Sequence, residues 1–406
     1  MRLGRFFVVG MLTINLLFFA ETLQGIKRGY PDFTVFYTAG KIVGAGHADE
    51  LYNPKVQYEV QQTFAGNIPF RHGPLPYIHP PFEGVIFVPL TWLAYPQAFV
   101  AWDLLNLAVL YGVALILRRS VASLGAVPAW KFVFVSIAFF PVFACLLEGQ
   151  DSILLLLLCT LAFYALKKNA DLLAGCWLSL ATFKFQFIVP VVLLFILWKR
   201  RRVAIGFAAV AIVMGLASTG LVGVKAMLAY PAYAVKISNT PGLGGVPAAL
   251  LPNLRGLVTG WAALLAGAVG SALTGVASIL IFILSVWSGL KFVGPRKIEL
   301  QFSLAIVVAG LIAWQTNTHD LSLLVLPLVL IADYCLFAMP QPRRDRFVLL
   351  HPVWPLLISP LWMGLWLVWG KVNLMAVPLL WWVWKISRAE REAKSQRDSA
   401  AGLAVR

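Results

Sequence analysis

Apolar runs of about 20 residues recur along almost the whole chain, and short clusters of Lys and Arg separate them. In a bilayer, a run of this length satisfies its backbone only as a helix, because no water is there to hydrogen-bond the peptide groups. The composition agrees with this reading, since 60% of the 406 residues are hydrophobic and 12% are charged, whereas soluble domains are about one quarter charged. The sequence therefore predicts an all-α, polytopic membrane protein with one integral membrane domain over residues 1–406.

The net charge of +16 raises the question of whether the protein binds nucleic acid. No basic domain stands outside the apolar runs, so we expect no nucleic-acid partner. Short loops rich in Lys and Arg stay in the cytoplasm. The charge therefore predicts topology, with both termini inside, a basic cytoplasmic tail over residues 387–406 and attraction to membrane lipids. About twelve transmembrane helices fit this rule. The expected crossings lie near residues 6–23, 97–117, 131–147, 152–166, 170–183, 187–198, 203–222, 272–291, 300–316, 321–338, 347–368 and 373–386.

Two apolar segments need separate interpretation. The first run follows Arg2 and Arg5 and resembles a signal peptide, but the residues around Glu21 make a poor cleavage site, so we expect a retained helix. Residues 82–95 contain Pro89 and are short, which favours a re-entrant segment lying against protein. The four cysteines all lie inside apolar runs with no close pair, so neither a disulfide nor a metal cluster is expected.

In this topology, the unusual polar motifs all face the extracytoplasmic side of the cell membrane. Polar groups at membrane depth are costly and usually mark function, so we expect them to form one extracytoplasmic site. The motifs are the first extracytoplasmic loop over residues 24–81, with its juxtamembrane helices, LEGQDS at 147–152, FKFQ at 183–186, PNLRG at 252–256 and NTHD at 317–320.

Asp32 follows a proline at the first membrane exit and precedes a helical pattern that includes Tyr37. It is either an N-cap or a partly desolvated carboxylate that accepts a proton from a hydroxyl. Asn53-Pro54 downstream has the pattern of an N-cap followed by proline in the first turn.

Lys184 lies between two short apolar runs, where it either extends to the interface or binds an anionic headgroup beside Gln186. Gln150 and Asp151 open a helix. Capping accounts for Asp151 and leaves Gln150 to bind a hydroxylated ligand.

His319 and Asp320 begin another apolar helix, and Asp320 is a candidate N-cap. His319 either hydrogen-bonds a phosphate or a sugar, or hydrogen-bonds a neighbouring carbonyl. Arg255 either pairs with phosphate or is a solvated surface charge. His79 lies in a proline-rich loop leading to the re-entrant segment. The histidines show no ligand spacing, and we expect no metal. Nucleotide-binding and hydrolase motifs are absent, so we expect no cofactor and a membrane lipid as donor.

The order of short motifs resembles glycosyltransferase family 87, from about residue 30 to 330. These motifs are Asp-Phe at residue 32, YTAG, LYNP, PPF, Gly-Gln, Lys-x-Gln and His-Asp-Leu. The resemblance implies the GT-C fold and transfer of a sugar, typically mannose, from a polyprenyl-phosphate donor to a hydroxyl of a lipid or glycan acceptor, with inversion. In the family, Lys-Pro-Gln is commoner than the Lys-Phe-Gln of this chain.

By the same resemblance, an acid in the first outer loop is the general base, and Asp32 holds that position. Further roles then follow for residues in the other motifs. Lys184, His319 and Arg255 would bind the donor phosphate, and Gln150, Gln186, Tyr37, His79 and Asp320 would bind sugar or acceptor.

Two other classes fit the composition. A lipid-linked sugar flippase without chemistry also needs a site for an anionic headgroup, but its polar groups should continue through the spans, whereas Glu83, Asp103 and Asp333 are scattered. A scaffold subunit would not need Asp32 and Lys184 at the membrane boundary.

Overall fold

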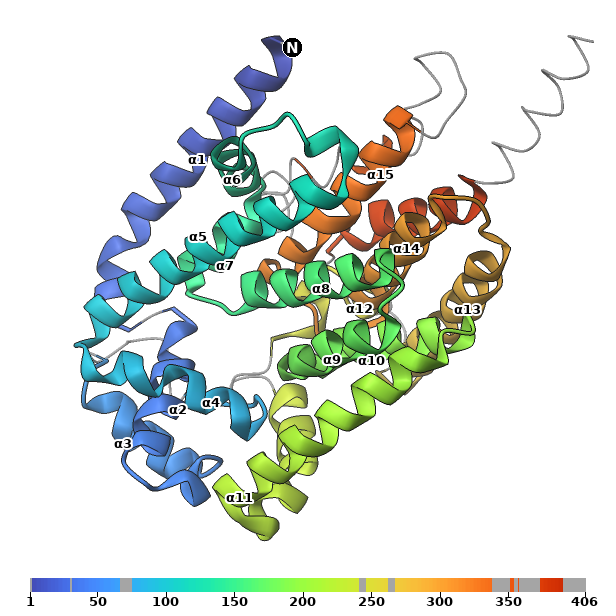
Figure 1. Cartoon of the computed structure of the whole chain (residues 1–406). Coiled ribbons are helices and arrows are strands. Elements are labelled where there is room, and N and C mark those ends of the chain that lie inside the picture. The colour runs from blue at the N-terminus through green and yellow to red at the C-terminus, as the bar shows by residue number, and fades with distance from the viewer. Residues whose placement is uncertain are drawn as a thin grey trace, which may run out of the picture.

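The computed structural model describes residues 2–29, 31–65, 75–240, 246–261, 267–337, 351–353, 357 and 373–389. The regular elements in these ranges are all helices, with no strand among them, which confirms the all-α prediction (Figure 1). The labelled α-helices are α1 (Arg2–Lys27), α2 (Phe33–Gly44), α3 (Pro54–Gln62), α4 (Pro81–Phe87), α5 (Tyr95–Ser120), α6 (Ala129–Ala138), α7 (Phe140–Glu148), α8 (Ser152–Lys167), α9 (Asp171–Leu180), α10 (Phe185–Leu197), α11 (Arg201–Asn239), α12 (Leu254–Trp261), α13 (Gly267–Lys291), α14 (Lys297–Ile312) and α15 (Val325–Phe337). Residues 376–389 are helical as well. Short 3₁₀ helices include η1 (Ala48–Glu50), η2 (Val88–Trp92), η4 (Ala181–Lys184), η5 (Ala248–Leu250) and η7 (His319–Leu324).

Six helical runs in these ranges are long and apolar enough to cross a membrane, or seven if the pair α6 and α7, bent by 85°, is one span. Twelve crossings are therefore not confirmed. The helices α8 and α14 have 16 residues each, about 24 Å, which is less than the roughly 30 Å of a hydrocarbon core. The expected crossing at 347–368 lies largely outside the described residues. The six runs are α1, α5, α9 with α10, α11, α13, and η7 with α15.

The run from Asp171 to Leu197 counts as one span by length alone, but its two ends meet. Arg200, just beyond the run, pairs with Asp171 at 2.6 Å, whereas a straight helix of 27 residues would be about 40 Å long. The run is therefore a hairpin with α9 and α10 as its arms and η4 as its tip. This hairpin carries Lys184 into the interior.

The hairpin packs between buried and peripheral helices. The helix α14 is buried at every position from Glu299 to Leu311, while α1, α11 and α13 expose large apolar side chains such as Leu16, Leu216 and Ile279. Figure 1 shows these three helices along the edges of the molecule, with α8, α9 and α10 nearer its centre. Exposed apolar surface of this extent is suited to lipid.

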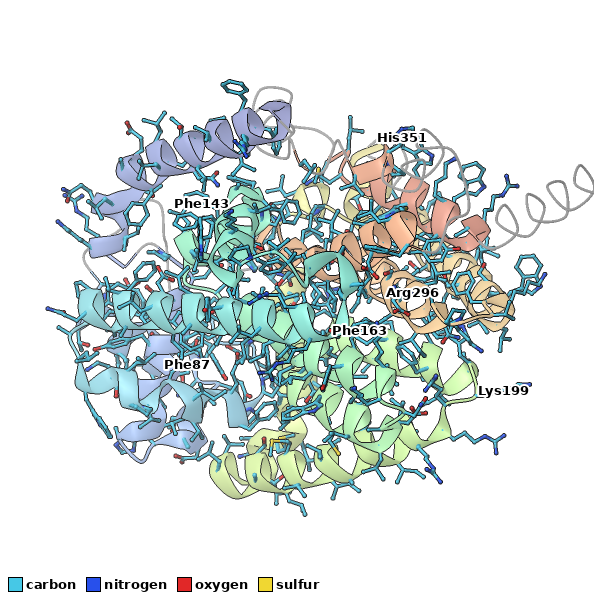
Figure 2. All side chains as sticks on the ribbon, turned by 45° about the horizontal axis from the view of Figure 1, so that its top comes forward. Phe87, Phe143, Phe163, Lys199, Arg296 and His351 are labelled. Atoms are coloured by element: carbon cyan, nitrogen blue, oxygen red, sulfur yellow. The ribbon has the colours of Figure 1, made fainter. Side chains whose placement is uncertain are left out.

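A group of ion pairs joins the helix ends remote from the first loop. Lys167 at the end of α8 pairs with Glu299 at 2.8 Å, and Arg296 pairs with Glu299 and Asp333. Figure 2 shows Phe87, next to the first-loop helices, on one side of the molecule, and Arg296 and Lys199 on the other. Arg296 and Lys199 therefore lie on a different side of the molecule from Phe87 (Figure 2).

Candidate functional site

Asp32 precedes α2, but its side chain makes no capping hydrogen bond. Its Oδ2 instead accepts a hydrogen bond of 2.7 Å from Nε2 of Gln150, and its backbone N–H donates to Oε2 of Glu148 at 3.3 Å. Gly149 makes this approach possible, because it has a φ of +60° and an added Cβ would lie 2.7 Å from Cβ of Phe33. The junction of α7 and α8 thus positions the carboxylate of Asp32.

Lys184 is 4% exposed and lies among acceptors. Its Nζ is 2.6 Å from Oδ1 of Asp320, 2.9 Å from Oδ1 of Asp151 and 3.5 Å from Oε1 of Gln150. A buried ammonium needs such partners, because its desolvation costs several kcal/mol. The charge of Lys184 is therefore compensated inside the protein.

Asp320 is a junction between three elements. Besides Lys184, its carboxylate accepts hydrogen bonds from Oγ of Ser152 at 3.0 Å and from the backbone N–H of Asn317 at 2.8 Å. His319 next to it has Nε2 at 3.6 Å from Oδ1 of Asp320. The predicted capping role is thus replaced by cross-links to α8 and to the hairpin tip.

His79 and Glu83 form a second part of the same cluster. Nδ1 of His79 is 2.8 Å from Oε2 of Glu83 and 3.5 Å from Oδ2 of Asp151. The backbone here is held by tyrosines, since the hydroxyls of Tyr52 and Tyr230 donate to the carbonyls of His79 and Ile78.

The environment shifts the ionisation of this group. Burial raises the pKa of Glu83 to about 8, with Asp151 adding to the effect and His79 opposing it. Burial alone would raise the pKa of Asp151, but the charges of Lys184 and His79 outweigh it and lower the pKa to about 2. Burial lowers the pKa of His79, but Glu83 outweighs it, so the pKa is raised.

A cavity of about 690 Å³ opens beside Asp32. Three carboxylates, from Glu21, Asp32 and Glu148, line it together with His319, and none of its described lining residues is Lys or Arg. Apolar side chains such as Ile26, Phe140, Ala144 and Leu147 also line it. The cavity therefore offers both hydrogen-bond acceptors and apolar surface suited to a lipid chain.

The structure brings six of the nine candidate residues into one connected cluster. They are Asp32, His79, Gln150, Lys184, His319 and Asp320.

Tyr37, Gln186 and Arg255 are not part of this cluster, and their predicted roles stay predictions. Tyr37 is buried among aromatic rings and donates to the carbonyl of Leu93 at 2.8 Å. Gln186 lies in the first turn of α10, two residues beyond Lys184, and does not line the cavity. Arg255 stacks on the ring of Trp314 at 3.9 Å from its centroid and donates to Asn239.

The sequence reasoning missed Glu83 and Glu148. His79 and Glu83 are four residues apart, a spacing that brings side chains to one face of a helix, and this signal was available. Glu148 lies in LEGQDS, two residues before Gln150, but nothing in that motif distinguished it from an interfacial charge. Asn53 caps α3 as predicted, since its Oδ1 accepts from the N–H of Lys55.

Comparisons with known proteins gave one result. The model of glycosyltransferase family 87 matches residues 77–327. This range contains every member of the cluster except Asp32. No curated protein and no solved structure matched the chain.

Proposed function

The chain belongs to glycosyltransferase family 87, and from this membership we propose that it moves a sugar from a polyprenyl-phosphate donor to a hydroxyl of a lipid or glycan acceptor. The observation that carries the proposal is the carboxylate of Asp32, fixed by Gln150 in the lining of a cavity that also has apolar lining residues. A carboxylate held in this way can act as a general base.

In the proposed step, Asp32 takes the proton of the acceptor hydroxyl as that oxygen attacks the anomeric carbon. The bond between this carbon and the phosphate oxygen breaks, and the polyprenyl phosphate leaves with the electron pair. Attack opposite the leaving group inverts the anomeric configuration. The apolar lining residues Ile26, Phe140, Ala144 and Leu147 would lie along the polyprenyl or acceptor chain.

The proposed role of His319 is the one that the family resemblance implies, whereas that of Lys184 differs. His319 lines the cavity and is the candidate donor to the departing phosphate. Lys184 is held by Asp151 and Asp320, so its proposed role is to position Gln150 and, through it, Asp32.

The residues that line the cavity also indicate which type of sugar it can bind. The carboxylates of Glu21, Asp32 and Glu148 line the cavity, and carboxylates accept hydrogen bonds well from hydroxyls. A neutral sugar such as mannose fits this lining, and Glu148 is the candidate partner of its hydroxyls. We place the site on the extracytoplasmic side of the cell membrane.

The proposal is tested with purified protein in lipid, radiolabelled polyprenyl-phosphate mannose and a crude lipid extract as acceptor. We expect label to enter a new glycolipid with the wild type. The rate should fall by about 10²- to 10⁴-fold in Asp32→Asn, because this variant removes the base and keeps its shape.

Asp103→Asn is the matched control, since Asp103 lies on α5 outside the cluster, and it should keep full activity. Undiminished transfer by Asp32→Asn would remove Asp32 as the base, and loss in Glu148→Gln would then assign that role to Glu148. Labelled donor that crosses the bilayer intact without transfer would favour a flippase.

A further inference from the structure

We propose that His79, Glu83 and Asp151 bind a divalent metal ion of the Mn²⁺ or Zn²⁺ class. The proposal concerns these three side chains only, and it does not depend on the donor, the acceptor or the role of Asp32. The three residues do not line the cavity beside Asp32, so the ion would join α4 to α8 instead of touching the sugar.

The geometry supports a shared ion. One ligand atom from each residue lies within 4.8 Å of the others, and Nδ1 of His79 is 2.8 Å from Glu83 and 3.5 Å from Asp151. Ligands about 2.1 Å from an ion in octahedral arrangement are about 3.0 Å apart. Small side-chain rotations therefore suffice to close the site.

The second observation is the set of polar atoms left without hydrogen bonds. Glu83 is 1% exposed and Asp151 is 0% exposed. Among the described residues, Oε1 of Glu83 has no hydrogen-bond partner, and both carboxylate oxygens of Asp151 and Nδ1 of His79 have ion-pair partners only, at 2.8–3.5 Å. An unsatisfied buried acceptor costs about 1–3 kcal/mol, and a coordinated ion would satisfy several at once.

The charges of the cluster point the same way. With Glu83 ionised and His79 neutral, the states in which both can coordinate an ion, the cluster contains the carboxylates of Glu83, Asp151 and Asp320 and the single ammonium of Lys184. Buried charges require neutralisation. A divalent ion supplies the two positive charges that Lys184 leaves uncompensated.

The three ligand side chains determine which type of metal ion fits the site. One imidazole and two carboxylates suit Mn²⁺ or Zn²⁺, whereas Ca²⁺ takes six to eight oxygen ligands and Mg²⁺ retains most of its water. The ligands are also well supported, since Tyr52 donates to the carbonyl of His79 and the hydroxyl of Tyr77 donates to that of Pro80. Such support holds ligands in place.

The test uses the full chain in detergent, stripped with EDTA, dialysed against Mn²⁺ or Zn²⁺ and analysed for bound metal. We expect about one ion per chain in the wild type and in Asp103→Asn, with a higher unfolding temperature than the stripped protein. Glu83→Gln and Asp151→Asn should bind at least about ten-fold more weakly and lose the temperature shift.

Absence of saturable binding by the wild type would overturn the proposal, and this measurement needs no variant to fold. Binding by Glu83→Gln and Asp151→Asn equal to that of the wild type would also overturn it, since the ion would then lie elsewhere. Because metal content is measured without substrate, either outcome leaves the proposed transferase reaction to its own test.

Discussion

Lys184 shows how one residue connects the parts of the site. Its Nζ contacts Asp151 at the start of α8 and Asp320 in η7, and it reaches Gln150, which holds Asp32. Its contact with Asp320 alone joins residues 136 positions apart in sequence. The lysine is therefore a cross-link between helix ends as well as a charge.

Removing this charge should destabilise the protein. Lys184→Met leaves Asp151 and Asp320 buried and facing each other, and breaking a buried pair in this way costs about 3–5 kcal/mol. We expect a clearly lower unfolding temperature in detergent and partial recovery when Asp320→Asn is added. Lys55→Met is the control, because its pair with Glu59 at 4.0 Å is exposed and should contribute under about 1 kcal/mol. Equal unfolding temperatures for both single variants would contradict this view of Lys184.

At the scale of elements, the hairpin of α9 and α10 depends on a close crossing with α11. A Cβ at Gly175 would overlap the carbonyl oxygen of Val203, and a Cβ at Gly206 would overlap that of Leu172. Small residues allow helix backbones to approach in this way. The position of the hairpin tip, and with it Lys184, follows from the crossing.

Gly206 and Gly215 on α11 provide a matched test of this crossing. Gly206→Ala should destabilise the protein by about 1–3 kcal/mol or more, because the two helices must separate. Gly215 has no atom within 4 Å of an added Cβ, so Gly215→Ala should be neutral or stabilising by up to about 1 kcal/mol. Thermal unfolding in detergent measures both, and a similar effect of the two substitutions would show that the crossing tolerates separation.

At the scale of the whole molecule, hydropathy predicted helices because a lipid-soluble chain has few other ways to satisfy its backbone. It did not predict how many helices cross, because apolar runs also form buried helices such as α14 and the arms of a hairpin. The convergence of Asp32, Gln150, Lys184 and Asp320 was predictable from polar residues at helix starts. The pairing between them was not, since it depends on contacts distant in sequence.

The remaining prediction concerns which end of the molecule faces the cytoplasm. The helix α5 has 26 residues, about 39 Å, so its ends lie on opposite sides of a bilayer. Lys55 is exposed on α3, which belongs to the first loop before α5, and Arg119 is exposed at the end of α5. Because basic loops stay inside, a membrane-impermeant maleimide should label Lys55→Cys in intact cells and Arg119→Cys only after permeabilisation.

The wild type controls for the native cysteines, three of which are buried. The reverse labelling pattern would place the cavity and Asp32 on the cytoplasmic side, where the lipid-linked donor would have to be presented from the inner leaflet.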